Sequence, residues 1–209
     1  MLMLPIVLFL HGFFASGSCI PAQSLRESFR GEADVLSPDL PLHPEQSLRF
    51  IRQLCLDRRP AVIVGNSAGS FLAQQIAVEL GIPALLGNPY FMMTEFLEPR
   101  RGQQKYKASR ADGKQDFVID QTLIDEFARL QEHQFDAVTP QQQERVVGLF
   151  GTHDTLAHFE PLFLQHYTHA LHFPGAHTPT AEEVAEYYVP AARKLMILKR
   201  LCGMHSLFW

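Results

Sequence analysis

Short apolar runs alternate along the chain with stretches in which apolar residues recur every three or four positions. The runs carry no regular polar position, which is typical of strands buried on both faces of a parallel sheet. We expect six of them, at residues 6–10, 33–37, 61–64, 84–87, 145–150 and 170–173. The periodic stretches predict helices at residues 23–30, 45–56, 120–131, 159–167 and 180–201, and one directly after Ser67. The alternation predicts an α/β fold with a doubly wound, mostly parallel, six-stranded sheet.

The segment from Tyr90 to about residue 140 interrupts this alternation and is too long for a bare connection. An apolar cluster at residues 90–97 is followed by a basic run at residues 100–114, which holds six positive charges and one acid. We expect a small lid inserted at about 90–140 into a single domain of residues 1–209, with Phe91 and Met93 lining an apolar pocket under it. The alternative is a disordered surface loop followed by one crossover helix. The basic charges are either solvated or attract anionic substrates.

Composition narrows the class of protein. A chain of 209 residues with 46% hydrophobic and 19% charged residues is long enough for one domain with a full core. Its net charge of -4 gives no indication of binding to nucleic acid or to an anionic membrane surface. The three cysteines have no metal-binding spacing, and the apolar N-terminus lacks a basic flank and a cleavage site. We therefore expect a cytoplasmic protein.

The sequence Gly65-Asn66-Ser67-Ala68-Gly69 stands between an apolar strand and a helix. Strand, sharp turn and helix form the context in which a Gly-x-Ser-x-Gly motif presents a nucleophilic serine. Ser67 is the expected nucleophile, held in a strained backbone conformation, and the two glycines allow close approach of strand and helix. The alternative is an ordinary turn in which Ser67 or Ser70 caps the helix.

A serine hydroxyl needs a base to take its proton, and a carboxylate to orient that base. Asp154 follows the fifth expected strand and His177 the sixth, so both fall at the edge of the sheet where Ser67 lies. His177 stands on a glycine-bearing loop, whereas His172 lies within a strand, so His177 is the expected base. Asp154 is preferred to Asp39 and Asp136, because only Asp154 follows the fifth strand.

The amides of Ala68 and Phe13 are the expected oxyanion donors, because they follow the nucleophile and the first strand. Phe14 is the alternative donor on the second loop and a candidate substrate contact. His11, on the same loop, is expected to hold it by hydrogen bonds. The other histidines crowd residues 153–172 without a zinc-binding pattern, so we expect no metal and no cofactor.

The chain resembles the α/β-hydrolase superfamily and, more narrowly, the small bacterial YqiA-like esterases. The resemblance covers roughly residues 6–195 and rests on the motifs at residues 10–13, 38–41, 65–69, 88–89, 151–154 and 175–177. It implies a compact esterase active on short acyl esters, with Ser67, Asp154 and His177 at the triad positions. The family often has a second glycine where this chain has Ser70, and it tends to have an aromatic pair where this chain has Thr178-Pro179. These differences leave the identity of the substrate undetermined.

These observations predict a serine hydrolase that cleaves small carboxylic esters or thioesters through an acyl-enzyme intermediate. Two alternatives stay open at this point: a catalytically silent scaffold with the same fold, and an acyltransferase with the same triad. The expected partner is a small-molecule substrate. The oligomeric state is open.

Overall fold

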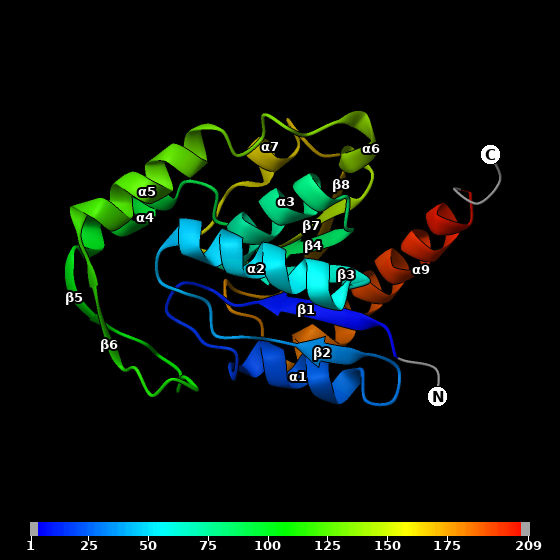
Figure 1. Ribbon diagram of the computed structural model, residues 1–209, viewed down its shortest axis with the longest axis horizontal. Helices are drawn as coiled ribbons and strands as arrows, with labels where there is room; N and C mark the ends of the chain where they lie inside the picture. Colours follow the sequence, from blue (N-terminus) through cyan, green and yellow to red (C-terminus); the bar gives the residue numbers. More distant parts are fainter. Residues whose placement is uncertain (1–3, 206–209) are drawn as a thin grey trace.

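The computed structural model describes the backbone of residues 4–205 and the side chains of residues 4–197. Its main sheet has six strands in the order β2-β1-β3-β4-β7-β8, and every neighbouring pair is parallel (Figure 1). The strands are β1 (Ile6–Leu10), β2 (Asp34–Leu36), β3 (Val62–Asn66), β4 (Ala84–Gly87), β7 (Val146–Gly151) and β8 (His169–Phe173). The predicted fold class is confirmed.

Helices cover both faces of this sheet, as the unbroken apolar strands require. Leu8 and Leu10 of β1 point into a core beneath α2 (Pro44–Arg58) and α3 (Ala68–Leu80). Their neighbours Val7 and Phe9 point the other way, into a core with α1 (Ile20–Ser28) and α9 (Val189–His205). Figure 1 shows these helix pairs on opposite sides of the sheet. The central strands β1, β3 and β4 are thus buried on both faces, whereas the edge strands β2 and β8 are partly exposed.

Some helix boundaries differ from the expected ones. The helix α1 begins three residues earlier than predicted, because Pro21 fits the first turn of a helix, where its missing N–H is not needed. The helix α7 (Glu160–Phe163) continues only as turns to residue 167. The last predicted helix is divided into α8 (Ala181–Glu183), a π-helical turn η2 (Val184–Tyr188) and α9. A π turn inserts an extra residue, so it changes which side chains of this helix face the sheet.

The segment between β4 and β7 contains most of the irregular structure. It includes α4 (Met93–Leu97), a 3₁₀ turn η1 (Glu98–Arg100), α5 (Gln121–Glu132) and α6 (Pro140–Gln143). The predicted helix at 120–131 is confirmed as α5, whose N-terminus is capped by Asp120. The basic run forms an antiparallel hairpin of β5 (Gly102–Lys105) and β6 (Asp116–Ile119), which was not predicted. In Figure 1 this hairpin lies beyond α4 and α5, away from the main sheet.

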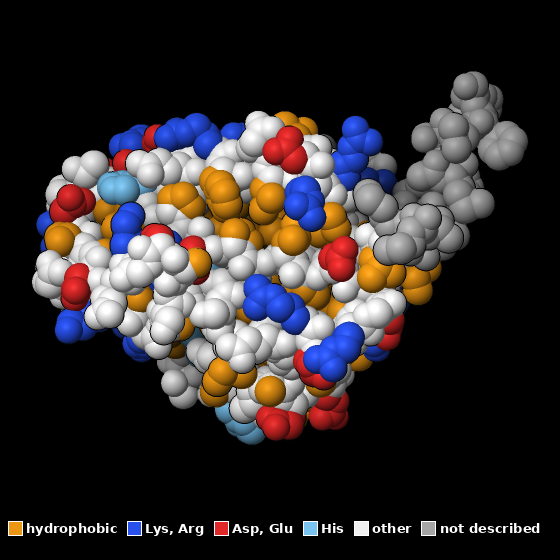
Figure 2. All heavy atoms as spheres, turned by 60° about the horizontal axis from the view of Figure 1, so that its bottom comes forward, with side chains coloured by type: hydrophobic (Ala, Val, Ile, Leu, Met, Phe, Trp, Pro, Cys, Tyr) orange, Lys and Arg blue, Asp and Glu red, His pale blue; other side chains and the backbone are white. Residues whose placement is uncertain are grey.

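Charged side chains of both signs are distributed over the surface. On the face drawn in Figure 2, basic and acidic side chains are interspersed, and apolar side chains lie between them. No helix in residues 4–205 has the length and apolar character needed to cross a bilayer.

Candidate active site

Ser67 occupies a strained turn between β3 and α3. Its backbone angles are φ 56° and ψ −122°, a combination that non-glycine residues rarely adopt. The flanking glycines permit this turn: a Cβ on Gly65 would lie 2.6 Å from the Ser70 backbone, and one on Gly69 would lie 2.0 Å from the Leu10 carbonyl oxygen. The sequence thus places the Ser67 hydroxyl at the carboxyl edge of the sheet, as predicted for this strand–turn–helix motif. We call the turn at residues 65–69 the elbow.

The structure brings Ser67, His177 and Asp154 together in one hydrogen-bonded chain. His177 Nε2 lies 2.8 Å from Ser67 Oγ, and His177 Nδ1 lies 2.8 Å from Asp154 Oδ2. With Nδ1–H donating to the carboxylate, Nε2 is left to accept the serine proton. The competing carboxylates lie elsewhere, since Asp39 binds backbone amides and Asp136 pairs with His133.

Asp154 is buried and held in its charged form. Burial alone raises the pKa of its carboxyl, but hydrogen bonds from His177 and from the amides of Leu156 and Ala157 outweigh it and lower the pKa below its usual value. The carboxylate is therefore available to orient His177 and to stabilise its protonated ring at neutral pH.

Asn88, at the end of β4, joins the loops that carry the acid and the base. Its side-chain amide donates to the carbonyls of Ala176 (2.8 Å) and His177 (3.0 Å), and its Oδ1 accepts from Gly151 N–H (2.7 Å). Asn88 is buried and has a left-handed φ of 39°, which asparagine tolerates better than most residues. The sequence analysis included residues 88–89 among the motifs of the family resemblance but gave Asn88 no role in the site.

Ala68 directly follows Ser67, and Phe13 lines the same cavity as Ser67; no hydrogen bond from the amide of either is found in the described part of the chain. Gly12, next to Phe13, lies so close that a Cβ there would be 3.5 Å from Ser67 Cβ. His11 holds this loop as expected: its Nδ1–H donates to the Gly12 carbonyl and its Nε2 accepts from Leu40 N–H. Burial lowers the pKa of His11 to about 4, so its ring is neutral at neutral pH.

A second buried contact supports the elbow from below. Tyr188, in the π turn, donates its hydroxyl proton to Asn66 Oδ1 at 2.9 Å. Its ring fills the space beside Gly87, where an added Cβ would lie 2.2 Å from the tyrosine oxygen. The residue before Ser67 is therefore fixed by a side chain from the opposite end of the sequence.

A cavity of about 420 Å³ opens over Ser67 and His177. Phe14 lines it, and its contact with a substrate stays a prediction. Its other lining residues include Phe13, Phe96, Arg100 and Lys107, the last three from the 90–140 segment. The 90–140 segment was expected to contribute side chains to the pocket, but its sequence gives no signal of which side chains face the cavity.

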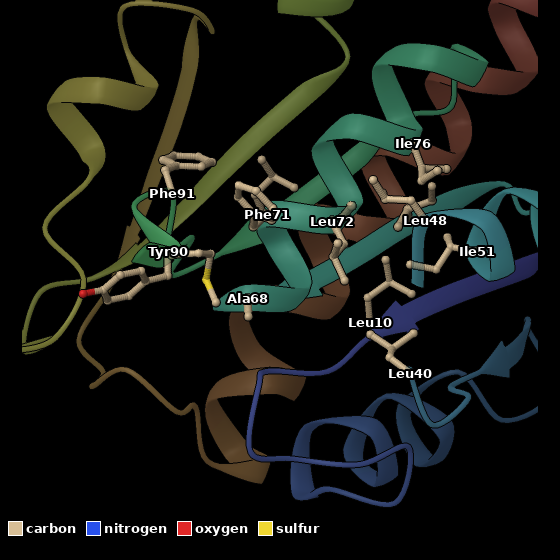
Figure 3. Close-up of a cluster of buried hydrophobic side chains, with 14 of the residues drawn as sticks. Leu10, Leu40, Leu48, Ile51, Ala68, Phe71, Leu72, Ile76, Tyr90 and Phe91 are labelled. Atoms are coloured by element: carbon tan, nitrogen blue, oxygen red, sulfur yellow. The ribbon is translucent and has the colours of Figure 1, made fainter. Parts of the chain in front are cut away.

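Phe91 and Met93 do not line this cavity, which corrects the expectation that they form an acyl pocket. Both are buried in the core on the α2–α3 face of the sheet, and Phe91 packs its ring against Phe135 and Phe159. Figure 3 shows Phe91 in the same buried cluster as Phe71. These side chains attach the segment to the sheet, a use of apolar residues that a sequence pattern does not distinguish from pocket lining.

Three histidines of the stretch from residue 153 to residue 172 have other contacts. His172 lies 2.9 Å from Glu160, His169 lies 2.8 Å from Glu144, and His166 stacks on the Phe135 ring. Among the described residues, no group of three or more His, Cys, Asp or Glu side chains is placed to hold a metal ion.

Comparison with known proteins gives matches in fold and family. A search among curated proteins gave no match. Among similar solved structures, Est1E from Butyrivibrio proteoclasticus has 14% sequence identity and a TM-score of 0.67, and the match covers 95% of this chain and 89% of that one. The metagenome-derived lipolytic enzymes LipS and LipT match with 16% identity and a TM-score of 0.66, over 92% of this chain and 94% of that one. The thioesterase domain from the curacin biosynthetic pathway matches with 14% identity and a TM-score of 0.61, over 92% of this chain and 91% of that one. Residues 7–200 match the alpha/beta hydrolase family. A match over most of the chain, together with this fold, shows that the protein belongs to the alpha/beta hydrolase family.

Proposed function

We propose that the protein is a serine hydrolase that cleaves small carboxylic esters or thioesters through an acyl-enzyme intermediate on Ser67. The observation that carries this proposal is the chain of 2.8 Å contacts from Ser67 Oγ through His177 to Asp154, at a strained elbow beneath an open cavity. A serine that only capped a helix would need neither this backbone strain nor a histidine on its hydroxyl.

The reaction follows from the positions of these groups. His177 Nε2 takes the hydroxyl proton while Ser67 Oγ bonds to the carbonyl carbon, and the amides of Phe13 and Ala68 stabilise the oxyanion. The bond to the leaving group then breaks, and the departing alcohol or thiol receives the proton from His177. Water repeats the sequence on the acyl-enzyme: His177 takes its proton and returns it to Ser67 Oγ as the acid is released.

Similar proteins support an ester substrate. Those reported above are described as an esterase, lipolytic enzymes and a thioesterase, so ester or thioester cleavage is the shared chemistry to carry over. The narrower assignment to the YqiA-like esterases rests on the motifs quoted from the sequence. We place the protein in the cytoplasm on its cysteine usage, and its partner is a small-molecule substrate.

We further propose that residues 90–140 act as a lid on a single hydrolase domain. The support is that Phe96, Arg100 and Lys107 line the cavity that also contains Ser67. The part of the site that this lid contributes is then formed by α4, η1 and the loop that follows β5.

Replacing Ser67 tests this function. Ser67→Ala removes the attacking oxygen, so kcat for a short acyl ester falls roughly 10³-fold or more. In the wild type, a fluorophosphonate adduct maps to Ser67. The matched control is Ser70→Ala, which removes a hydroxyl three positions later that only donates to the Gly87 carbonyl; it keeps most of the activity.

His177→Ala loses activity to a similar extent, and the double variant Ser67→Ala, His177→Ala is no worse than either single one, because the groups act as a unit. Near wild-type turnover by Ser67→Ala, or an adduct on another residue, contradicts the assignment. An ester and thioester panel with water or an added alcohol as acceptor separates hydrolysis from acyl transfer.

A further inference from the structure

Two cationic side chains of the lid segment, Arg100 and Lys107, line the cavity over Ser67. No Asp or Glu is among the described residues that line this cavity with them. The carboxylate of the site, Asp154, is buried and accepts hydrogen bonds from His177 and two amides. The charge that a substrate meets in the cavity is therefore positive, although the whole chain carries -4.

Neither cation has a carboxylate partner in the described part of the chain. Arg100 donates one N–H to the Phe96 carbonyl (2.6 Å) and stacks over the Phe96 ring, with 4.2 Å from Cζ to the centroid. The ammonium of Lys107 lies 5.5 Å from the centroid of Phe14. These contacts position the two charges without neutralising them, so the remaining N–H donors are free for a ligand.

Other basic residues of the same run are used differently. Arg101 forms an ion pair with Glu98 (2.6 Å), and Arg110 and Lys114 both approach Asp112. Lys105 does not line the cavity over Ser67; it lines a neighbouring surface hollow, which Lys107 also borders. The basic run thus divides into charges directed at the site and charges that are paired or lie elsewhere.

The surroundings of the two cations are aromatic. Phe13, Phe14 and Phe96 line the same cavity, and their rings contact one another edge-on or tilted, with centroids 5.4 to 6.0 Å apart. An apolar wall with charge at its rim fits a ligand that has an apolar body and an anionic end. A guanidinium fork and an ammonium are the groups that proteins use for carboxylates and phosphates.

We propose that Arg100 and Lys107 form an anion subsite, which selects ester substrates that carry a carboxylate or a phosphate in addition to the ester. This inference rests on the proposed function of Ser67, and it names the substrate class for that site. The apolar body of the substrate contacts Phe13, Phe14 and Phe96, while its ester carbonyl reaches Ser67.

The test compares two charge-matched double variants. Arg100→Gln, Lys107→Gln removes the cavity cations, and Arg101→Gln, Lys105→Gln removes the same charge from the same run outside the cavity. Three substrates are used: phenyl acetate, which is neutral, 4-carboxyphenyl acetate, which has an anionic leaving group, and monophenyl succinate, which has an anionic acyl group. The last two show on which side of the ester the subsite lies.

For the anionic ester on the favoured side, the ratio of its kcat/KM to that of phenyl acetate falls about 5- to 10-fold in the cavity variant, which corresponds to two partly exposed ion pairs. The ratio changes less than about twofold in the control variant, where only long-range, salt-screened attraction is lost. Added salt reduces the wild-type preference. Equal ratios in the two variants, or no preference for either anionic ester in the wild type, would overturn the anion subsite.

A binding measurement keeps this test separate from catalysis. Ser67→Ala protein is titrated calorimetrically with phenyl phosphate, with benzoate and with neutral benzamide. Tighter binding of either anion, lost when Arg100→Gln and Lys107→Gln are added, supports the subsite even if no ester is turned over. Binding that does not depend on ligand charge contradicts the subsite, while the Ser67 adduct and phenyl acetate turnover still report on the proposed function.

Discussion

At the scale of single residues, the amide of Asn88 connects the end of β4 to the loops that hold Asp154 and His177. Removing it in Asn88→Ala leaves buried backbone groups without partners, which costs about 1–3 kcal/mol. We expect kcat to fall at least about tenfold with little change in KM, because the base is misplaced while the cavity remains. The kcat/KM pH profile should also shift, since the contact between His177 and Asp154 is loosened.

Asn88→Gly is the matched control for backbone strain, because glycine tolerates the φ of 39° that alanine resists. Both variants lose the same hydrogen bonds, so their kinetic defects should agree while Asn88→Gly is the more stable of the two. An unaltered pH profile in both would show that Asn88 supports only the fold.

His11 makes the stability of the fold depend on pH. Its pKa is lowered by burial from 6.5 to about 4, so the unfolded chain binds its proton more readily than the folded one. Stability therefore falls as pH decreases from about 6.5 to 4, by on the order of 3 kcal/mol. Urea unfolding at a series of pH values measures this slope, and His11→Asn should flatten it within that window.

The lowered pKa of Asp154 affects stability in a lower pH range. The contribution of this carboxylate to the stability of the fold is present above the ordinary carboxyl pKa and is lost only as pH falls through the lowered pKa. An unchanged slope between pH 4 and 6.5 in His11→Asn would show that another group is responsible.

At the scale of elements, the loop between β5 and β6 is fastened to the two loops beside the site. We call residues 106–111 the strap. Asp39 accepts from Gly17 N–H at 2.8 Å and from Ala111 N–H at 2.6 Å, so one carboxylate joins the strap to the loop after β1. Lys107 N–H donates to the Phe14 carbonyl at 2.8 Å. The position of Lys107 thus depends on this attachment.

Asp39→Ala should release the strap. Trypsin cleavage at Lys107 and Arg110 under native conditions is expected to become several-fold faster, because local opening exposes the strap without global unfolding. Asp125→Ala is the control, since the side-chain hydrogen bond of Asp125 within the described residues is to Gln121 of its own helix. Mass spectrometry of the early fragments measures the rates at each site. Equal cleavage rates in both variants would contradict the attachment.

The elements of the main sheet could be predicted because each strand is a short apolar run with a helix after it, and the alternation dictates a parallel sheet. The hairpin of β5 and β6 could not be predicted, since both strands have only four residues and one exposed side, and β5 consists of glycine and polar residues. The π turn was also missed, because an extra residue inside a helix leaves its apolar pattern nearly unchanged.

At the scale of the whole molecule, some site residues could be predicted from the sequence and others could not, and the difference lies in the interactions that position them. Ser67, Asp154 and His177 could be placed from sequence because each follows a parallel strand, and the carboxyl ends of such strands share one edge. Phe91 could not be distinguished from pocket lining, because core and pocket take the same apolar residues. Arg100 and Lys107 face the cavity through long-range contacts that no local pattern encodes.

The hydroxyl of Tyr188 reaches Asn66 across 122 positions of sequence, and the ring of His177 reaches Ser67 across 110. A ribosome releases the N-terminal part of a chain first, so β1, β3 and the elbow emerge long before either partner. A nascent or truncated chain that stops before residue 177 can present Ser67, but it has neither the base nor the tyrosine that fixes the elbow. The order of translation thus delays the assembly of Ser67, His177 and Asp154 until nearly all of the described fold has been synthesised, and on the proposed function we expect fragments left by interrupted synthesis to be inert toward esters.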